Sequence, residues 1–479
     1  MSSERSAIIL AAGLGTRMKS TKPKVLHELL GRTLLGHVLR STKAVGPDRR
    51  IVVVGAAADQ VTAHLEQHAP DVETVYQAEQ LGTGHAVRIA LEAAPDLEGT
   101  VIVACGDAPL LRPDTLGRLV EAHEQAANAA TVLTAVVDDP TGLGRIVRDE
   151  DGSVLRNVEH RDADPDELAI SEINSGTYAF DAAALREQLA KLTTANDQGE
   201  EYLTDVLELT REAGLRIGAV VVDDATEVLA CNDRAQLAGL RKVLRDRINT
   251  DLMKSGVTIE DPDTTWIDVT AKVAPDVLLR PGCQLKGATA VDSGAEIGPD
   301  TTLNDTLVGA DAAVVRSHAD QATVAEGAKV GPFAHLRPAS KLAEGAKVGA
   351  FTETKNVEIG PGAKIPHLSY IGDATVGAKA NIGCGVIVAN YNGTSKEHTE
   401  IGGGAFVSCN STLIAPVTVA DGAYVAAGST VTDDVAPGEL AVARARQVNK
   451  EGWVAKRLPG TVVDEAAKRA LKDEESSGE

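Results

Sequence analysis

The segment IGGGAFVSCNSTLIAPVTVADGAYVAAGSTV, residues 401–431, has an aliphatic side chain at every sixth position. These positions are Ile401, Val407, Leu413, Val419, Val425 and Val431. A period of six fits neither an α-helix, whose period is about 3.6 residues, nor a half-buried strand, whose period is about 2. The pattern is typical of a hexapeptide solenoid, and it extends back to about residue 267.

The repeat predicts a three-sided parallel β-helix, in which each hexapeptide forms one short side and its aliphatic residue points inward. Small residues, mostly Gly or Ala, follow the aliphatic positions and suit the tight corners. The polar segment 390–400 interrupts the period, so we expect it to leave the column as a loop. Insertions in solenoids tend to lie on the binding face. The repeat alone also fits an inert oligomerisation domain.

The N-terminal half alternates apolar strands with amphipathic helices, which predicts an α/β layer fold with a mostly parallel, Rossmann-like sheet. The predicted strands are 7–10, 50–54, 73–76, 100–105, 131–137 and 216–222, and two predicted helices are 34–45, capped by Thr33, and 113–126. The predicted domains are 1–231 and 257–446, joined by an amphipathic helix over 232–256. A tail follows over 447–479, and we expect its end to be disordered.

The composition limits the partners and the compartment. The net charge of -22 argues against nonspecific binding to nucleic acid or to an acidic membrane. No apolar run approaches the roughly 20 residues of a membrane span. The five cysteines are far apart, odd in number and without a Cys-x-x-Cys pair, which favours reduced thiols in a cytoplasmic protein.

A glycine-containing segment follows the first predicted strand. Residues 10–18 read LAAGLGTRM, and Pro23-Lys24 comes shortly afterwards. Glycines let backbone N–H groups approach a phosphate, and Arg17 and Lys24 supply positive charge. Asp107 lies at the carboxyl end of another strand, where ligands of open α/β sheets bind, and its carboxylate suits Mg²⁺. Each feature alone also occurs for structural reasons, glycine in turns and aspartate at caps.

Together these segments resemble the sugar-1-phosphate nucleotidyltransferases. The resemblance implies that a phosphate oxygen of the sugar phosphate attacks UTP and releases pyrophosphate, with Mg²⁺, Arg17 and Lys24 neutralising charge. It implies Asp107 and Asn232 as metal ligands. It also implies that UTP and the nucleotide sugar contact Leu10, Ala11, Ala12, Gly13, Lys24, Gln77, Gly82, Thr83 and Asn232, with Gly144, Glu159 and Asn174 at the sugar phosphate.

The repeat half resembles the left-handed β-helix acyltransferases, and the two halves in this order resemble the bacterial bifunctional enzymes that make UDP-N-acetylglucosamine. The resemblance covers nearly the whole chain. It implies a homotrimer with acetyltransferase sites between subunits. It places glucosamine 1-phosphate at Arg337, Lys355, Tyr370, Asn381 and Lys396, and acetyl-CoA at Asn390, Tyr391, Cys409, Ala427 and Arg444. His367 is the expected base, because neutral imidazole suits proton transfer near pH 7.

Two positions depart from the family's pattern. Cys409 stands where serine lies near acetyl-CoA, and Cys105 stands where tyrosine precedes Gly-Asp. Neither change removes a proposed catalytic group. One alternative is a single-activity sugar-1-phosphate nucleotidyltransferase with a structural or regulatory β-helix. Such a β-helix has no reason to hold His367, Arg337, Lys355 and Tyr370 together. A noncatalytic sugar-nucleotide sensor would require a defective first site.

Overall fold

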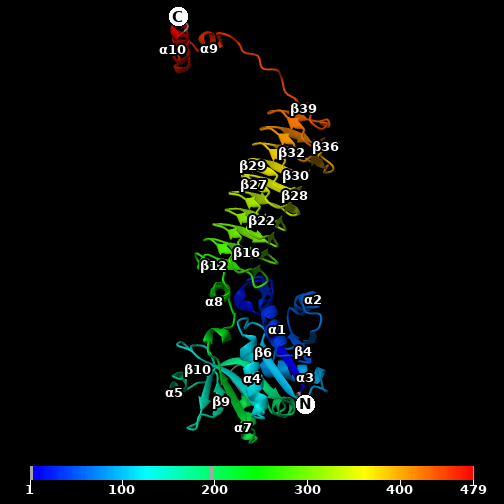
Figure 1. Cartoon of the computed structure of the whole chain (residues 1–479). Coiled ribbons are helices and arrows are strands. Elements are labelled where there is room, and N and C mark those ends of the chain that lie inside the picture. The colour runs from blue at the N-terminus through cyan, green and yellow to red at the C-terminus, as the bar shows by residue number, and fades with distance from the viewer. Residues whose placement is uncertain (1–3, 195–198, 478–479) are drawn as a thin grey trace. The chain divides into compact units, whose positions relative to one another are not determined.

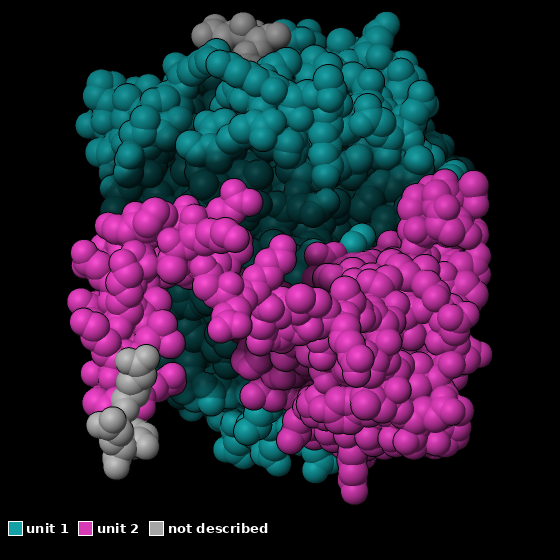
Figure 2. Space-filling view, turned by 90° about the horizontal axis from the view of Figure 1, so that it is seen from above, with its two compact units in different colours: residues 1–338 teal, residues 339–479 magenta. Residues whose placement is uncertain are grey.

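The computed structural model describes residues 4–194 and 199–477. Its chain divides into two compact units, a first unit of residues 1–338 and a second unit of residues 339–479 (Figure 2). The division falls inside the hexapeptide repeat, after Pro338. The boundaries expected at 231, 256 and 446 therefore stay a prediction.

A mostly parallel sheet organises the N-terminal part of the first unit (Figure 1). Its strand order is β11-β7-β10-β6-β1-β4-β5, and only β10 runs antiparallel to its neighbours β6 and β7. A hairpin of β8 and β9 attaches to β10. The strands are β1 Arg5–Ala11, β4 Arg49–Val54, β5 Glu73–Tyr76, β6 Thr100–Cys105, β7 Ala130–Val136, β8 Arg145–Arg148, β9 Val154–Val158, β10 Glu172–Asp181 and β11 Ile217–Val221, with the small pair β2 Glu28–Leu29 and β3 Arg32–Thr33 beside them.

Helices cover both faces of this sheet because its strands are apolar on both sides. Along β1, Ile8 belongs to one buried cluster, whereas Ala7 and Ile9 belong to the other, since consecutive strand residues point to opposite faces. Thr33 caps α1 as predicted, accepting from the Gly36 N–H at 3.0 Å. The helices are α1 Leu34–Ala44, α2 Ala58–His68, α3 Thr83–Ala93, α4 Pro113–Gln125, α5 Pro165–Leu168, α6 Ala182–Leu189 and α7 Asp205–Glu212, with short 3-10 turns at Thr16–Met18, Lys24–Leu26 and Ala225–Val228.

Helix α8, Arg234–Lys254, follows the sheet and begins at the cap Asp233. Its Leu237 and Leu240 pack in a small buried cluster with Met18 and Leu34. The charged side of α8 is not simply solvated, because Arg247 donates to the carbonyl oxygen of Leu110 at 2.7 Å. The helix is therefore attached to the N-terminal sheet domain by both apolar and polar contacts.

The β-helix part of the first unit consists of very short parallel strands. Each strand pairs with the third strand onward, which gives three sides per coil. One column of inward aliphatic residues runs through Leu279, Ile297, Val314 and Val330, all in register and buried. The strands are β12 Thr258–Ile259, β13 Trp266–Ile267, β14 Lys272–Val273, β15 Leu278–Leu279, β16 Gln284–Lys286, β17 Ala290–Val291, β18 Glu296–Ile297, β19 Thr302–Asn304, β20 Leu307–Val308, β21 Ala313–Val314, β22 His318–Asp320, β23 Thr323–Val324, β24 Lys329–Val330 and β25 His335–Leu336.

The second unit continues the same repeat with its own inward columns (Figure 1). Ile382, Val407 and Val425 are in register and fully buried. Segment 390–400 leaves the column as expected, and Tyr391 and Lys396 form an antiparallel bridge across it. The strands are β26 Ser340–Leu342, β27 Lys347–Ala350, β28 Glu353–Ile359, β29 Lys364–His367, β30 Tyr370–Val376, β31 Asn381–Ile382, β32 Ile387–Ala389, β33 Thr399–Ile401, β34 Phe406–Val407, β35 Thr412–Ile414, β36 Val417–Val419, β37 Tyr424–Val425, β38 Thr430–Val431 and β39 Leu440–Ala441.

The C-terminal tail contains two helices, of which only the second reaches the last residues, where disorder is predicted from the sequence. Helix α9 spans Trp453–Arg457, and α10 spans Val462–Ser477. Lys468 pairs with Asp464 one turn earlier at 2.8 Å, a spacing that supports an exposed helix. Residues 478–479 lie outside the described part of the chain. Among the described residues, no helix is both long and apolar enough to cross a membrane.

We predict that the inward aliphatic column dominates the stability of the β-helix. Ile382→Ala empties a fully buried position and should lower the free energy of unfolding by about 2–5 kcal/mol. The matched control Ile414→Ala, at a position that is 37% exposed, should lower it by only about 1 kcal/mol. Urea unfolding followed by circular dichroism at one fixed protein concentration measures both. Equal losses in the two variants would contradict the column's role.

Candidate active sites

A cavity of about 280 Å³ opens at the carboxyl ends of β1 and β6, and we refer to it as the β1–β6 cavity. The two strands are neighbours in the sheet, with Leu10 in register with Cys105. Loops that leave adjacent parallel strands at this edge form the usual ligand crevice of such sheets. Nine of the predicted residues line the cavity: Leu10, Ala11, Ala12, Gly13, Lys24, Gln77, Gly82, Thr83 and Asp107.

The end of β1 and the loop after it accept hydrogen bonds from neighbouring loops, and Gly13 in this loop faces open space. Gln80 donates to the carbonyl oxygen of Ala12 at 2.8 Å, and the Gly106 N–H donates to that of Leu10 at 2.9 Å. A Cβ atom on Gly13 would meet nothing within 4 Å, so a ligand could approach the backbone there. Gly15 has a φ of +60°, and a Cβ there would lie 2.6 Å from the Lys24 Cβ. Glycine at position 15 therefore lets Lys24 lie against the loop.

The predicted cations and metal ligands meet beside this cavity. The Lys24 ammonium contacts the Asp107 carboxylate and lies 3.4 Å from the side-chain oxygen of Asn232. Arg17 donates to the same Asn232 oxygen at 2.9 Å. Asn232 reaches this point because the neighbouring Cys231 N–H donates to the backbone carbonyl of Asp107 at 2.9 Å. Residues more than 200 positions apart in the sequence thus form one charged group.

The oxygen donors of this group fit a divalent cation that also binds phosphate. Asp107 and Asn232 both lie within reach of the Lys24 ammonium, so their oxygens are close to one another. Hard oxygen ligands are those that Mg²⁺ takes, usually together with water and substrate phosphates. Among residues 4–194 and 199–477, no group of three or more His, Cys, Asp or Glu side chains could hold a metal. A cation here would therefore need further ligands from water or substrate phosphates.

The residues predicted at the sugar phosphate gather on β10 and the β8–β9 hairpin. The Asn174 N–H donates to the carbonyl oxygen of Gly144 at 3.0 Å, and Asn157 donates to the Glu159 carboxylate at 3.0 Å. A Cβ on Gly144 would lie 2.7 Å from the Asn157 side chain, so only glycine leaves room for this packing. Burial raises the pKa of Glu159. Gly144, Glu159 and Asn174 lie outside the lining of the β1–β6 cavity.

Cys105 connects the cavity with this sugar side. Its thiol donates to the carbonyl oxygen of Gly176 at 3.6 Å, and the Gly176 N–H donates to the Asn174 side chain at 2.9 Å. Burial raises the pKa of Cys105 to about 12, so the thiol stays protonated near neutral pH. At this position the small thiol therefore contributes a weak hydrogen bond rather than a nucleophile.

Two residues that support the loops around the cavity, without lining it, were not predicted from the sequence. Gly55 follows β4, and a Cβ there would lie 2.4 Å from the carbonyl oxygen of Ala12. Glu201 accepts from Arg88 at 2.8 Å, and its backbone accepts from the Gly84 N–H at 2.8 Å, which anchors the Gly82–Thr83 turn. A glycine after a buried strand was the signal for Gly55, but only the fold shows which loop it faces.

The second group of predicted residues lies at a corner of the β-helix in the second unit. His367 ends β29, and Tyr370 begins β30 after the corner. Lys355 on β28 is in register with Gly372, two residues beyond Tyr370. A Cβ on Gly372 would lie 2.5 Å from the Tyr370 hydroxyl and 3.1 Å from the Asn390 amide nitrogen. Lys355, Tyr370 and Asn390 therefore share one face next to the His367 corner.

Residues predicted for acetyl-CoA follow the same edge onto later coils. Two residues after His367, the Ser369 hydroxyl donates to the carbonyl oxygen of Gly383 at 3.2 Å. The Asn410 N–H then donates to the carbonyl oxygen of Cys384 at 2.8 Å, and the Gly428 N–H donates to the carbonyl oxygen of Cys409 at 2.9 Å. A Cβ on Gly428 would lie 3.7 Å from the Arg444 side chain. Cys409, Ala427 and Arg444 thus lie along an edge, an arrangement that suits a long, thin ligand.

The remaining predicted residues are more dispersed. Asn381 lies on β31, in register with Lys364 of the strand that ends at His367. Tyr391 and Lys396 are exposed in the 390–400 loop, where they bridge to one another. Arg337 belongs to the first unit, and the other predicted acetyltransferase residues belong to the second.

Comparison with known proteins decides the family. The bifunctional protein GlmU of Streptomyces avermitilis is 52% identical over 98% of this chain and 98% of its own length. The bifunctional protein GlmU of Corynebacterium aurimucosum is 50% identical over 97% of this chain and 96% of its own length. The chain belongs to the GlmU family. Residues 7–205 also match the MobA-like NTP transferase domain family.

Membership of the GlmU family confirms the predicted fold class, an α/β nucleotidyltransferase domain followed by a left-handed β-helix. It also confirms the predicted bifunctional enzyme of UDP-N-acetylglucosamine synthesis, with uridyltransferase and acetyltransferase activities. A solved structure of UDP-glucose pyrophosphorylase with UDP-glucose covers 51% of this chain and 99% of its own at 17% identity, but its TM-score of 0.43 is too low to carry an argument.

We predict that Gly55 positions the loop after β1 in this GlmU family member. Gly55→Ala should push the carbonyl group of Ala12 away and lower the kcat/KM for UTP by roughly 10- to 100-fold. Gly117→Ala is the matched control, because a Cβ on this α4 residue would meet nothing within 4 Å. Steady-state uridyltransferase kinetics measure the effect, and an unchanged circular-dichroism spectrum and melting temperature show that the sheet domain has folded. Equal kinetics in both variants would rule out the positioning role.

Proposed function

We propose that this chain acetylates glucosamine 1-phosphate with acetyl-CoA at the His367 corner and then transfers UMP from UTP to the product at the β1–β6 cavity. The observation that carries this proposal is the meeting of Arg17, Lys24, Asp107 and Asn232 at the ends of β1 and β6. A group of two cations, a carboxylate and an amide oxygen is suited to a nucleoside triphosphate with a divalent cation.

In the uridylyl step, a phosphate oxygen of N-acetylglucosamine 1-phosphate attacks the α-phosphorus of UTP, and pyrophosphate leaves. Arg17 and Lys24 offset the negative charge on the triphosphate, so Lys24 exchanges the Asp107 carboxylate for phosphate oxygens. Mg²⁺, held by Asp107 and Asn232, would supply further charge neutralisation when bound. Gln77, Gly82 and Thr83 hold the base, and Gly144, Glu159 and Asn174 orient the sugar.

In the acetyl step, the amine of glucosamine 1-phosphate attacks the thioester carbonyl of acetyl-CoA. The C–N bond forms, the C–S bond breaks, and the amine proton passes to His367, which can return it to the leaving thiolate. Arg337 and Lys355 bind the sugar phosphate, with Tyr370, Asn381 and Lys396 completing the pocket. Asn390, Tyr391, Cys409, Ala427 and Arg444 bind acetyl-CoA.

The proposal includes a homotrimer in which neighbouring β-helices complete the acetyltransferase sites. The exposed loop residues Tyr391 and Lys396 support it, because they extend from the column that holds His367. The proposal also includes a cytoplasmic location, where the five free cysteines would stay reduced.

A coupled assay with glucosamine 1-phosphate, acetyl-CoA, UTP and Mg²⁺ tests the order of the reactions. We expect free thiol to appear before pyrophosphate. Pyrophosphate release that requires added N-acetylglucosamine 1-phosphate, without thiol release, would contradict the acetyl step and direct attention to Cys409.

We predict that His367→Ala lowers the acetyltransferase kcat by roughly 10²–10⁴-fold, because the base that takes the amine proton is lost. Uridyltransferase activity should stay unchanged. His398→Ala is the matched control, since His398 is an exposed histidine of the same unit that bonds only to Thr375 and Glu400 in the described structure. Thiol release with acetyl-CoA measures the effect, and a normal rate in His367→Ala would disprove the assignment.

We predict that Asp107→Asn lowers the uridyltransferase kcat by roughly 10²–10³-fold, because it removes a charged oxygen ligand without changing the side chain's size. The Mg²⁺ concentration needed for half-maximal activity should rise, whereas acetyl transfer should persist. Asp114→Asn, at an exposed residue in the first turn of α4, is the control for loss of one charge. A normal Mg²⁺ requirement in Asp107→Asn would argue against the metal role.

A further inference from the structure

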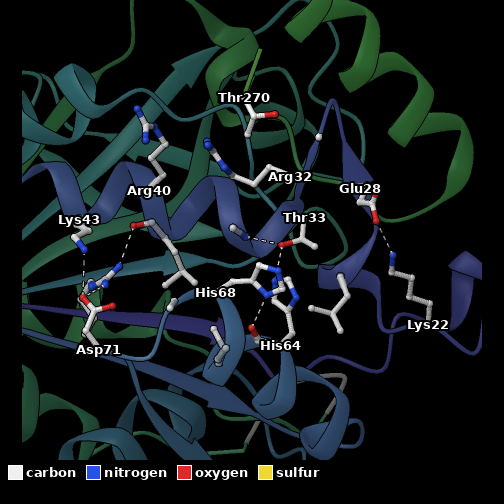
Figure 3. A pocket seen from close by; sticks show the side chains of 17 residues that line it. Lys22, Glu28, Arg32, Thr33, Arg40, Lys43, His64, His68, Asp71 and Thr270 are labelled. Carbon is white, nitrogen blue, oxygen red and sulfur yellow. Dashed lines mark hydrogen bonds and ion pairs between the residues drawn. The ribbon is translucent and has the colours of Figure 1, made fainter. Parts of the chain in front are cut away.

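A second cavity of about 550 Å³ lies beside α1, and we refer to it as the basic pocket. Residues before and along α1 form one wall, and the C-terminal end of α2 forms another (Figure 3). Its volume is within the range of small-molecule sites. The basic pocket shares no lining residue with the β1–β6 cavity, so it is a separate site.

The lining of the basic pocket is positive although the whole chain carries a net charge of -22. Two carboxylates in the lining are already paired. Lys22 pairs with Glu28 at 3.4 Å, and Lys43 pairs with Asp71 at 3.5 Å. Arg50 also pairs with the Asp71 carboxylate. Lys22, Lys43 and Arg50 therefore pair with the only two carboxylates among the described residues of this lining.

Arg32 and Arg40 remain without a carboxylate partner among the residues that the structure describes. Figure 3 shows both side chains on the same side of α1, and Thr270 also lies on that side. Burial lowers the pKa of Arg32, and the nearby charge of Arg40 lowers it further. The Arg32 side chain is half-buried and the Arg40 side chain is exposed at the rim, so two like charges repel one another there, and a bound anion would relieve that repulsion.

Helix α1, which follows Arg32, has a glycine where the Arg32 side chain passes. A Cβ on Gly36 would lie 2.8 Å from the Arg32 Cγ and 2.9 Å from the Thr33 hydroxyl. Glycine at position 36 therefore leaves room for the Arg32 side chain to cross α1. On the opposite wall, the stacked rings of His64 and His68, 4.3 Å apart, are fixed by the contact of His64 with Thr33 at 3.1 Å.

We propose that the basic pocket binds a phosphate-bearing small molecule through Arg32 and Arg40. Guanidinium groups form planar, paired hydrogen bonds with phosphate, and a phosphate group carries about two negative charges near neutral pH. The ammonium of Lys43, at the same rim, is available as a further donor once its loose contact with Asp71 is exchanged. None of the residues proposed for either active site lines this pocket.

The location of the pocket places its ligand next to the catalytic segment. Lys22 and Leu26 line the basic pocket, whereas Lys24 and Val25, between them in the sequence, line the β1–β6 cavity. One 3-10 turn, Lys24–Leu26, therefore separates the two cavities.

Calorimetric titration with inorganic phosphate at constant ionic strength tests the proposal. The unchanged protein should bind one more phosphate per chain than Arg32→Gln/Arg40→Gln, or bind it at least roughly tenfold more tightly. Arg118→Gln/Arg211→Gln is the control for charge, because both arginines are exposed residues of the same unit and neither lines the pocket. Identical phosphate binding by all three proteins would overturn the proposal.

Two further measurements keep the result specific. In phosphate-free buffer, Arg32→Gln/Arg40→Gln should melt at or above the temperature of the unchanged protein, because the substitution removes like charges. A clear drop would show that the pair serves the fold and would overturn the site. Succinate, a dicarboxylate, should not replace phosphate in the same titration, and preferential binding of succinate would overturn the assignment of a phosphate ligand.

Discussion

The whole C-terminal architecture depends on burying one aliphatic side chain per hexapeptide. Strands of two or three residues cannot bury enough apolar area to persist alone, so each coil relies on the coils above and below it. The register from Ile382 through Val407 to Val425 shows this dependence directly. Since the inward positions are occupied by packing, the outward and corner positions are free to carry chemistry.

The two active sites use rigid secondary structure in different ways. In the N-terminal sheet domain, loops from adjacent strand ends bring Lys24 and Asp107 together, and a backbone hydrogen bond to Asp107 brings in Asn232. In the β-helix, the repeat itself aligns corner residues on successive coils, so His367 and Cys409 lie along one edge. The first arrangement concentrates charge at a point, which suits a triphosphate. The second extends over several coils, which suits a long acyl carrier.

Local charge matters more than net charge in this protein. The chain is strongly acidic, yet its cations meet at the β1–β6 cavity and at the basic pocket. At the first of these, Lys24 is balanced by Asp107, whereas Arg32 and Arg40 have no such counter-charge among the described residues. Unbalanced cations next to a catalytic turn are a reason to look for an anionic ligand there.

The amino-acid sequence by itself determined the features that recur within short distances. The six-residue period predicted the β-helix. Short apolar runs that alternate with amphipathic helices located six of the strands, β1, β4, β5, β6, β7 and β11. The glycine-containing loop with Arg17 and Lys24, and the strand-end Asp107, indicated the first site. Tertiary structure alone decided that β10 is antiparallel, that Gly55 faces Ala12 and that Arg32 and Arg40 share a pocket. These features depend on contacts between segments distant in the chain, and no local pattern of side chains specifies which distant segment will be the partner.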